Sequence, residues 1–169
     1  MIEIQLGDIV LEDRDAIVNA ANEMLAAGSG ISGAIHAAAG RHLEQECLQI
    51  GGCPTGEARV TAGYALKAKY VIHAVAPRYW DGTRGEVELL RKTYRSIFEA
   101  ALKNKMRSIS IPAIGTGIYR FPLQEATQIA LETAKNYADL IQIRFVCFDQ
   151  KAVEIYSREA SAFGLLGEG

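Results

Sequence analysis

The alternation of apolar runs with helical patterns along the whole chain constrains its fold more than any other feature. Six short apolar runs are typical of strands, several of them strands covered on both faces: residues 2–6, 16–19, 58–62, 70–76, 108–114 and 143–148. Helical periodicity fills the stretches between them, without a repeat, a low-complexity linker or a break in composition. This alternation predicts an α/β layered domain with a largely buried sheet.

Four helices are predicted between these strands. The first begins near Gly33 and carries one apolar stripe, made of Ile35, Ala39, Leu43, Cys47 and Ile50. The second covers residues 86–104, the third starts at Pro122, a favoured first-turn residue, and the fourth occupies about residues 151–163. The short first strand and the turn at residues 7–9 are expected to pair antiparallel at an edge, which would make the sheet mixed.

Length and charge limit the classes of partner. A chain of 169 residues that is 49% hydrophobic suits one domain spanning residues 1–169. The formal net charge of −2 provides no strong field for nucleic acid or an anionic membrane, and the basic stretch at 103–107 reads as a solvated helix end. Three scattered cysteines without a CxxC pair indicate neither a disulfide framework nor zinc. We expect a monomer in the cytoplasm, with no signal segment or membrane span.

A first glycine loop immediately precedes the first long helix and consists of Gly28, Ser29, Gly30, Ile31, Ser32 and Gly33. Free backbone N–H groups and the helix dipole favour a phosphate there. The loop also matches the GxGxxG dinucleotide fingerprint, but the nine residues 20–28 lead from the nearest strand to its first glycine, and Glu44 and Glu46 fall inside a helix. A P-loop is excluded because Ala34 stands where lysine is required.

A second glycine loop follows the buried strand at 108–114 and consists of Gly115, Thr116, Gly117, Ile118 and Tyr119. It lies at the carboxyl end of a strand, where open α/β sheets place ligands. Glycine there allows close backbone approach and amide nests for anions, although either loop alone could be merely a tight turn. The two loops together favour a cradle around a diphosphate.

Five motifs in order resemble the macrodomain family, particularly its MacroD-type ADP-ribose hydrolase branch. They are GDI at 7–9, DAIVNAAN at 15–22, GSGISGAIHAAAG at 28–40, GGCPTGEARVTAGY at 51–64 and IPAIGTGIYRFP at 111–122. The resemblance covers about residues 1–160. It implies a three-layer α/β/α sandwich with a mixed, mostly parallel central sheet, and ADP-ribose in a cleft at the crest.

The resemblance also implies roles for individual residues. Asp8 matches the acidic residue that accepts a hydrogen bond from the adenine amino group, with the Ile9 backbone beside it, and Phe148 matches an aromatic that stacks on adenine. The two glycine loops match those that wrap the diphosphate and distal ribose. Asn22 matches the asparagine that holds the distal ribose hydroxyls, a role suited to an amide that both donates and accepts.

Ser32 departs from the hydrolytic branch, where aspartate is usual and is thought to orient or activate water. Serine cannot act as a general base near neutral pH without a partner, and no histidine is evidently placed to help. Ser32 could cap the helix at Gly33 or position water, so we expect slow turnover or none, with Asn22 and Ser32 as the catalytic candidates. Ser29 slightly restricts its loop, and Arg120, where the family often has glycine, would reach either a phosphate or solvent.

Two functions use the same cleft, and the sequence leaves open whether the protein is an enzyme. One is a module that binds free or protein-linked ADP-ribose; the other is an ADP-ribosyl hydrolase or O-acetyl-ADP-ribose deacetylase. A nucleotide-dependent oxidoreductase and nucleic-acid binding rank below both. No cofactor is predicted, and no metal, because His36 and His42 lie six apart on one helix. His73 reads as a satisfied core histidine and Trp80 as a hydrophobic anchor for its loop, although it could touch ligand.

Overall fold

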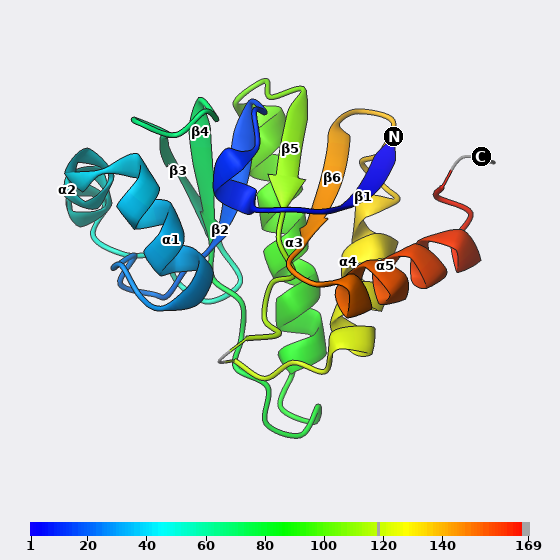
Figure 1. Cartoon of the computed structure of the whole chain (residues 1–169). Coiled ribbons are helices and arrows are strands. Elements are labelled where there is room, and N and C mark those ends of the chain that lie inside the picture. The colour runs from blue at the N-terminus through cyan, green and yellow to red at the C-terminus, as the bar shows by residue number, and fades with distance from the viewer. Residues whose placement is uncertain (118, 167–169) are drawn as a thin grey trace.

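A mixed six-stranded sheet lies at the centre of the computed structural model, which describes residues 1–117 and 119–166 (Figure 1). The strands are β1 (Ile2–Leu6), β2 (Ala16–Ala20), β3 (Ala58–Ala62), β4 (Tyr70–Ala74), β5 (Ser108–Ile111) and β6 (Gln142–Cys147). Their order across the sheet is β1-β6-β5-β2-β4-β3. All six predicted strands are present, with ends that differ from the sequence pattern by at most three residues.

The antiparallel pair lies at the edge opposite to the one predicted. β1 runs parallel to β6, with Ile2 opposite Ile143, so the expectation of an antiparallel first strand is wrong. β3 instead pairs antiparallel with β4, with Val60 opposite Ile72. The physical reason is the connection length: residues 63–69 are too short for a crossover, and such a turn can only return the chain beside itself.

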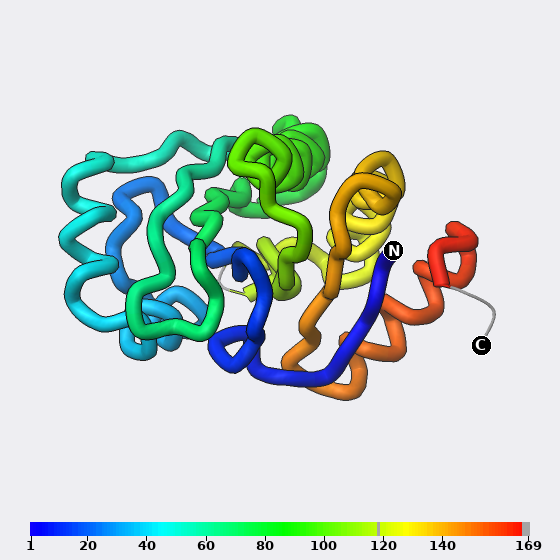
Figure 2. The backbone as a smooth tube through the Cα atoms, turned by 90° about the horizontal axis from the view of Figure 1, so that it is seen from above, coloured from blue at the N-terminus to red at the C-terminus, as the bar shows by residue number. Residues whose placement is uncertain are grey.

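Helices cover both faces of the sheet, as Figure 2 shows from above. One layer holds α1 (Gly30–Ala39) and α2 (Arg41–Ile50), while the other holds α3 (Glu86–Lys103), α4 (Leu123–Ala134) and α5 (Gln150–Ala162). A short 3₁₀ helix, η1 (Ile9–Leu11), follows β1. The predicted three-layer α/β/α sandwich is confirmed.

The first predicted helix is in fact two helices. The helix is interrupted at Gly40, whose φ of 91° and ψ of 176° are backbone angles that residues other than glycine rarely adopt. The apolar stripe continues across the break, because Leu43 and Cys47 of α2 enter the same buried cluster as Ile35 and Ala39 of α1. Periodicity alone therefore did not reveal the break.

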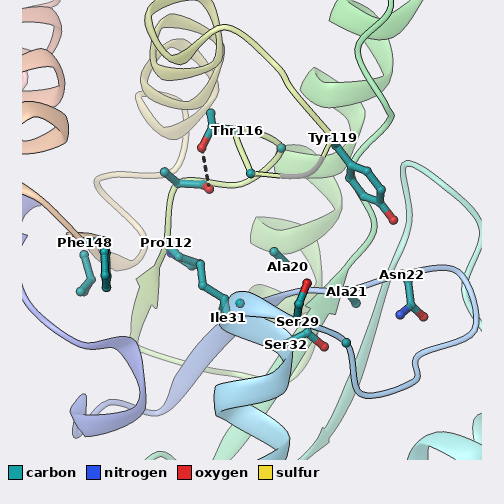
Figure 3. Close-up of a pocket in the computed structure, with 16 residues that line it drawn as sticks. Ala20, Ala21, Asn22, Ser29, Ile31, Ser32, Pro112, Thr116, Tyr119 and Phe148 are labelled. Atoms are coloured by element: carbon teal, nitrogen blue, oxygen red, sulfur yellow. Dashed lines mark hydrogen bonds between the residues drawn. The ribbon is translucent and has the colours of Figure 1, made fainter.

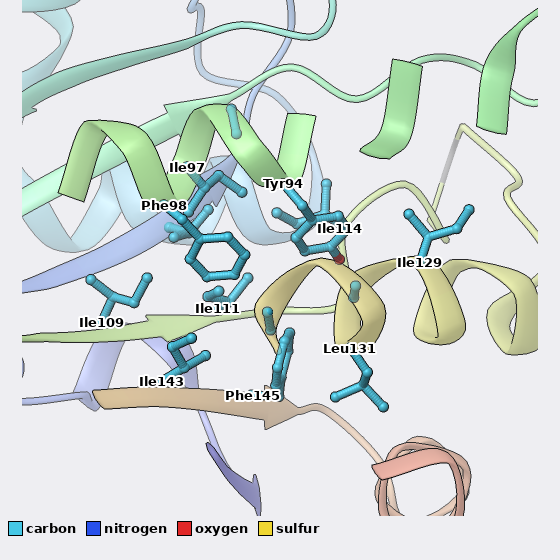
Figure 4. Close-up of a cluster of buried hydrophobic side chains, with 14 of the residues drawn as sticks. Tyr94, Ile97, Phe98, Ile109, Ile111, Ile114, Ile129, Leu131, Ile143 and Phe145 are labelled. Atoms are coloured by element: carbon cyan, nitrogen blue, oxygen red, sulfur yellow. The ribbon is translucent and has the colours of Figure 1, made fainter. Parts of the chain in front are cut away.

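Adjacent residues of the central strands point into two different cores. Ile17 and Val71 face α1 and α2, whereas Val18 and Ile72 face the layer of α3, α4 and α5. In that larger core, the buried side chains in Figure 4 come from α3 and α4 and from β5 and β6; they include Tyr94, Ile97, Phe98, Leu131, Ile109, Ile111, Ile143 and Phe145. Each such side chain contributes about 1.5–3 kcal/mol to folding when it is buried, so the strand ends from which the loops start are held by a well-packed core.

Three properties of the described chain bear on function. None of its helices combines the length and apolar composition needed to cross a membrane. The same residues contain no group of three or more His, Cys, Asp or Glu side chains placed to hold a metal ion. Cys47, Cys53 and Cys147 are all buried as free thiols.

Candidate functional site

A cleft of about 380 Å³ opens where β2, β5 and β6 end (Figure 3). It brings together most of the residues predicted from sequence: Asn22, Gly28, Ser29, Gly30, Ile31, Ser32, Gly115, Thr116, Gly117, Tyr119 and Phe148. Asp8, Ile9 and Gly33 do not line it, and Ile118 lies outside the described residues. The two glycine loops therefore face one common space.

The N-terminus of α1 forms one wall of the cleft. The helix begins at Gly30, and within the described chain the backbone N–H groups of Gly30, Ile31 and Ser32 have no hydrogen-bond partner. Three unpaired donors at the positive end of a helix form a favourable environment for a phosphate. Behind this wall the Gly28 backbone packs directly against Gly33, since a Cβ at Gly33 would lie 2.4 Å from the Gly28 carbonyl oxygen.

Ser32 does not cap α1, so that part of the sequence interpretation is wrong. The N-cap residue is Ser29 and the helix begins at Gly30, earlier than predicted, so Ser32 lies in its first turn. The Ser32 side chain is buried and lines the cleft, yet its Oγ has no hydrogen-bond partner among the described residues. An unpaired buried hydroxyl beside a cleft is a position for water or a ligand oxygen.

The second loop turns tightly at Gly115, whose φ is 85°, and the Phe121 N–H closes the turn on the Gly115 carbonyl at 2.8 Å. The Thr116 hydroxyl donates to the Ala113 carbonyl at 3.2 Å (Figure 3). No partner is found in the described part of the chain for the Thr116 and Gly117 N–H groups. Like the start of α1, this loop therefore presents free donors to the cleft.

Arg120 follows the second loop in a left-handed conformation, with φ of 62°, and its side chain is exposed. Its N–H donates to the Gly117 carbonyl at 3.0 Å. Glycine tolerates this conformation without cost, whereas arginine does not. Arg120 does not line the cleft, which favours the solvent alternative over the phosphate alternative.

The amide of Asn22 holds the turn at residues 22–26, which precedes the first glycine loop. Its Oδ1 accepts from the Ala26 N–H and its Nδ2 donates to the Ala26 carbonyl, both at 3.1 Å. An amide has a second N–H and a second lone pair on oxygen, so Asn22 retains one donor and one acceptor site. Asn22 can therefore hold the turn at residues 22–26 and still bind a diol.

Of the adenine-binding residues implied by the resemblance, Phe148 lines the cleft, whereas Asp8 and Ile9 do not. Phe148 lines the cleft and is 92% exposed, so the faces of its ring are accessible to a ligand. Asp8 caps η1 by accepting from the Val10 N–H at 3.1 Å, and its carboxylate is exposed. The side chain of Ile9 is buried in the core under α1, which leaves only its backbone for a ligand.

The sequence profile of the Macro domain family matches residues 18–130. The chain belongs to the macrodomain family. A Macro domain-containing protein of Mesorhizobium japonicum is 47% identical over 165 residues, covering 95% of this chain and 94% of that protein. One from Methanosarcina mazei is 44% identical over 164 residues, covering 95% and 88% respectively.

Solved macrodomains share this structure closely. The Oceanobacillus iheyensis macrodomain, as a glycine-to-valine mutant with ADPR, superposes with a TM-score of 0.91 at 37% identity, covering 96% of this chain and 92% of that one. The Trypanosoma brucei macrodomain in complex with ADP-ribose gives 0.86 at 42% identity, covering 93% and 68%. The predicted family is confirmed; membership of the MacroD-type branch stays a prediction.

Sequence reasoning missed the small and apolar walls of this macrodomain's cleft, which are Ala20, Ala21, Pro112, Ala113 and Val146. They lie at or just beyond the ends of β2, β5 and β6. A signal was available, because residues at the carboxyl ends of neighbouring parallel strands meet at one edge of a sheet. These walls give the space between the two loops apolar sides.

His36 was considered in the sequence only as a metal ligand, and its place one helical turn from Ser32 was missed, although its side chain does not line the cleft. It lies four positions after Ser32 on α1, and therefore on the same face of the helix. It is buried, and neither ring nitrogen has a partner among the described residues. Burial lowers the pKa of His36, with Glu44 opposing weakly, so the ring is neutral and retains an accepting nitrogen. The Ser32–His36 spacing was the signal.

His73 is a satisfied core histidine, as predicted. It is fully buried on β4, where Nδ1 lies 3.1 Å from Asn19 Nδ2 and Nε2 lies 2.9 Å from Thr61 Oγ1. Since the amide nitrogen can only donate, Nδ1 accepts and the proton of the neutral ring sits on Nε2. Burial, with a smaller contribution from His36, lowers the pKa of His73 to about 3.

Proposed function

We propose that this macrodomain binds ADP-ribose, free or attached to a protein side chain. One observation carries the proposal: unpaired backbone donors of two glycine loops face one cleft, and an exposed aromatic ring stands at its end. Donors of this kind suit a diphosphate, and the ring suits a purine. The Trypanosoma brucei macrodomain in complex with ADP-ribose, 42% identical to this chain, lends support.

The ligand would lie along the cleft in one direction. Adenine would stack on Phe148 near Asp8, and the diphosphate would lie between the start of α1 and the second loop. The distal ribose would then reach Asn22, whose remaining donor and acceptor match two hydroxyls. Figure 3 shows Phe148 at one end of the cleft and Asn22 with Tyr119 at the other.

Calorimetric titration with ADP-ribose tests this arrangement. Phe148→Ala should weaken binding about tenfold, because a stacked base contributes roughly 1–3 kcal/mol. The ring is 92% exposed, so the fold should not change. Leu48→Ala, which removes a 72% exposed apolar side chain from α2, is the matched control and should bind normally. No binding by the native protein would refute the proposal.

A second candidate function is slow hydrolysis of the ADP-ribosyl bond or of O-acetyl-ADP-ribose. It is favoured by the unpaired Ser32 Oγ, which faces the cleft one helical turn from His36. The hydroxyl can hold water, but no carboxylate is present at this position to accept its proton. Turnover therefore depends on a ligand phosphate as the proton acceptor, because His36 neither lines the cleft nor bonds Ser32 among the described residues.

A de-ADP-ribosylation assay separates a reader from an enzyme. Ser32→Asp should raise turnover by about 10²–10⁴, the usual contribution of a positioned base. Asn22→Ala should abolish any native turnover, whereas His42→Gln, on the exposed surface of α2, should leave it unchanged. A native rate unaffected by Asn22→Ala would place the activity elsewhere.

We also infer a reducing compartment, the cytoplasm, and a monomeric protein. Burial, reinforced by nearby carboxylates, raises the pKa of Cys47 and Cys147 to about 11. Such thiols stay protonated and are slow to oxidise. Disulfides found by thiol titration of freshly extracted protein would contradict the compartment, and a dimer mass by light scattering would contradict the monomer.

A further inference from the structure

Residues 77–85, the outer part of the connection between β4 and α3, are folded around one buried carboxylate. Glu86 is 2% exposed and accepts from the N–H groups of Trp80 at 3.1 Å, Asp81 at 3.1 Å and Gly82 at 2.8 Å, and also from that of Arg84. Burial opposes its ionisation, yet these backbone donors prevail and lower the pKa of Glu86 to about 2. The loop therefore has a fixed shape despite its length.

The same loop is attached to the rim of the cleft. The Tyr79 N–H donates to the Tyr119 carbonyl at 2.8 Å, and the Tyr79 and Phe121 rings pack with centroids 4.8 Å apart. Tyr119 lines the cleft at the end where Asn22 lies (Figure 3). Tyr79 is thus the hydrophobic anchor of this loop, and the interpretation that gave Trp80 this role is wrong, since Trp80 is 58% exposed.

Trp80 instead forms an exposed platform with two arginines. The guanidinium carbons of Arg78 and Arg84 lie 5.4 Å and 5.1 Å from the centre of its ring. Neither arginine makes a salt bridge within the described residues. Stacking on the ring orients both guanidinium groups and leaves their N–H donors available. We call these three residues the Arg–Trp–Arg platform.

We propose that the Arg–Trp–Arg platform binds an acidic stretch of the polypeptide that carries the ADP-ribose. The inference rests on the proposed function, because a polypeptide attached at the distal ribose would leave the cleft beside Asn22 and Tyr119. Loop 77–85 adjoins that exit through Tyr79. Guanidinium forks match carboxylates, so Glu and Asp side chains flanking the modified residue are the groups that fit.

The geometry favours an acidic peptide over nucleic acid. Cations already lie over the Trp80 ring, so a base that stacked there would compete with a guanidinium. Two guanidinium groups on one loop of a chain with net charge −2 do not make the long basic stripe that a phosphate backbone needs. An acidic peptide needs only two short contacts to carboxylates, which the two guanidinium groups of the platform can provide.

The chain has one tryptophan, so its fluorescence reports on the platform directly. The native protein would be titrated with free ADP-ribose and with two peptides that carry ADP-ribose through a hydrolysis-resistant linkage, one flanked by glutamates and one by glutamines. We expect the acidic peptide to bind about five- to tenfold more tightly than the neutral one. Trp80 emission should respond to the acidic peptide, and the preference should fade at high salt.

A double variant, Arg78→Gln with Arg84→Gln, should lose the preference but keep the affinity for free ADP-ribose. Arg41→Gln with Arg158→Gln removes the same charge from exposed positions on α2 and α5 and should retain the preference. If the native protein binds free ADP-ribose but shows no preference, or the platform variant retains it, the inference is overturned and the proposed function stands. Quenching of Trp80 by an oligonucleotide in place of the acidic peptide would also overturn it. If the native protein fails to bind free ADP-ribose, both the proposed function and this inference are refuted.

Discussion

Single residues decide the chemistry of this cleft more than its shape does. Ser32 stands where the resemblance to the hydrolytic branch implies aspartate, and its buried hydroxyl has no partner among the described residues. The pattern around Ser32 could be recognised from sequence, but its position within the first turn could not. That position depends on the start of α1 at Gly30, which the apolar stripe from Ile35 onward does not reveal. A capping role was therefore inferred for a residue that faces the cleft.

Arg120 gives a prediction at the same scale. Its φ of 62° costs a residue with a side chain roughly 1–2 kcal/mol, partly offset by the greater freedom of glycine in the unfolded chain. Arg120→Gly should raise the free energy of unfolding by about 0.5–1 kcal/mol, measured by urea denaturation. Affinity for ADP-ribose should be unchanged, and a large loss of it would revive the phosphate contact.

A matched substitution shows whether conformation is the cause. Arg158→Gly makes the same chemical change at an exposed position inside α5. There the residue is helical, so glycine should lower the free energy of unfolding by about 1 kcal/mol. The same sign of effect at both positions would contradict the explanation from backbone conformation.

At the scale of elements, α1 and the loop before it act as one unit. Gly33→Ala would place a Cβ 2.4 Å from the Gly28 carbonyl oxygen, a backbone atom that can retreat only if the loop moves. We expect ADP-ribose affinity to fall at least tenfold by calorimetry, since the loop would leave its place beside the free N–H groups of the helix.

Loss of stability could also weaken binding, and a neighbour on the same helix provides the control. Ala37→Gly lies on the exposed side of α1 and should cost about 1 kcal/mol through helix propensity alone. It should leave affinity nearly unchanged at temperatures where both variants are folded. Equal losses of affinity in the two variants would argue against a displaced loop.

The elements themselves could largely be predicted from sequence, and the failures have identifiable causes. Continuous apolar runs predict the strands because both faces of the sheet are covered. The break at Gly40 was missed because the apolar stripe runs through it, and the pairing of β1 was missed because one short strand does not indicate its neighbour. The two loops could be found singly, but the apolar walls at Pro112 and Val146 required the strand order.

Across the whole molecule, two buried neutral histidines make stability depend on pH. The folded-state pKa of His73 is lowered to about 3 from 6.5, and that of His36 is also lowered. Well above pH 6.5 the two histidines are uncharged in the folded and in the unfolded chain, so they do not change the free energy of unfolding with pH. Below pH 6.5 these histidines bind protons in the unfolded chain but not in the folded chain. The free energy of unfolding should therefore fall by up to about 1.4 kcal/mol per pH unit for each histidine.

Urea denaturation between pH 7.5 and about 5, above the range in which Glu86 titrates, would measure this slope. His73→Gln should lower stability at pH 7.5 but flatten the dependence on pH. His42→Gln, on the exposed surface of α2, is the control and should retain the native slope. A native slope that survives in the His73 variant would assign the effect to other groups.

The walls of the cleft come from three stretches of chain, around residues 20–32, 112–119 and 146–148, that only the sheet brings together. No contiguous fragment of the sequence contains all three without nearly the whole fold between them. A partly synthesised or partly opened chain therefore lacks the complete site, and a nucleotide bound there would hold β2, β5 and β6 in place from their ends. Occupancy should accordingly slow amide hydrogen exchange deep in these central strands as well as in the loops.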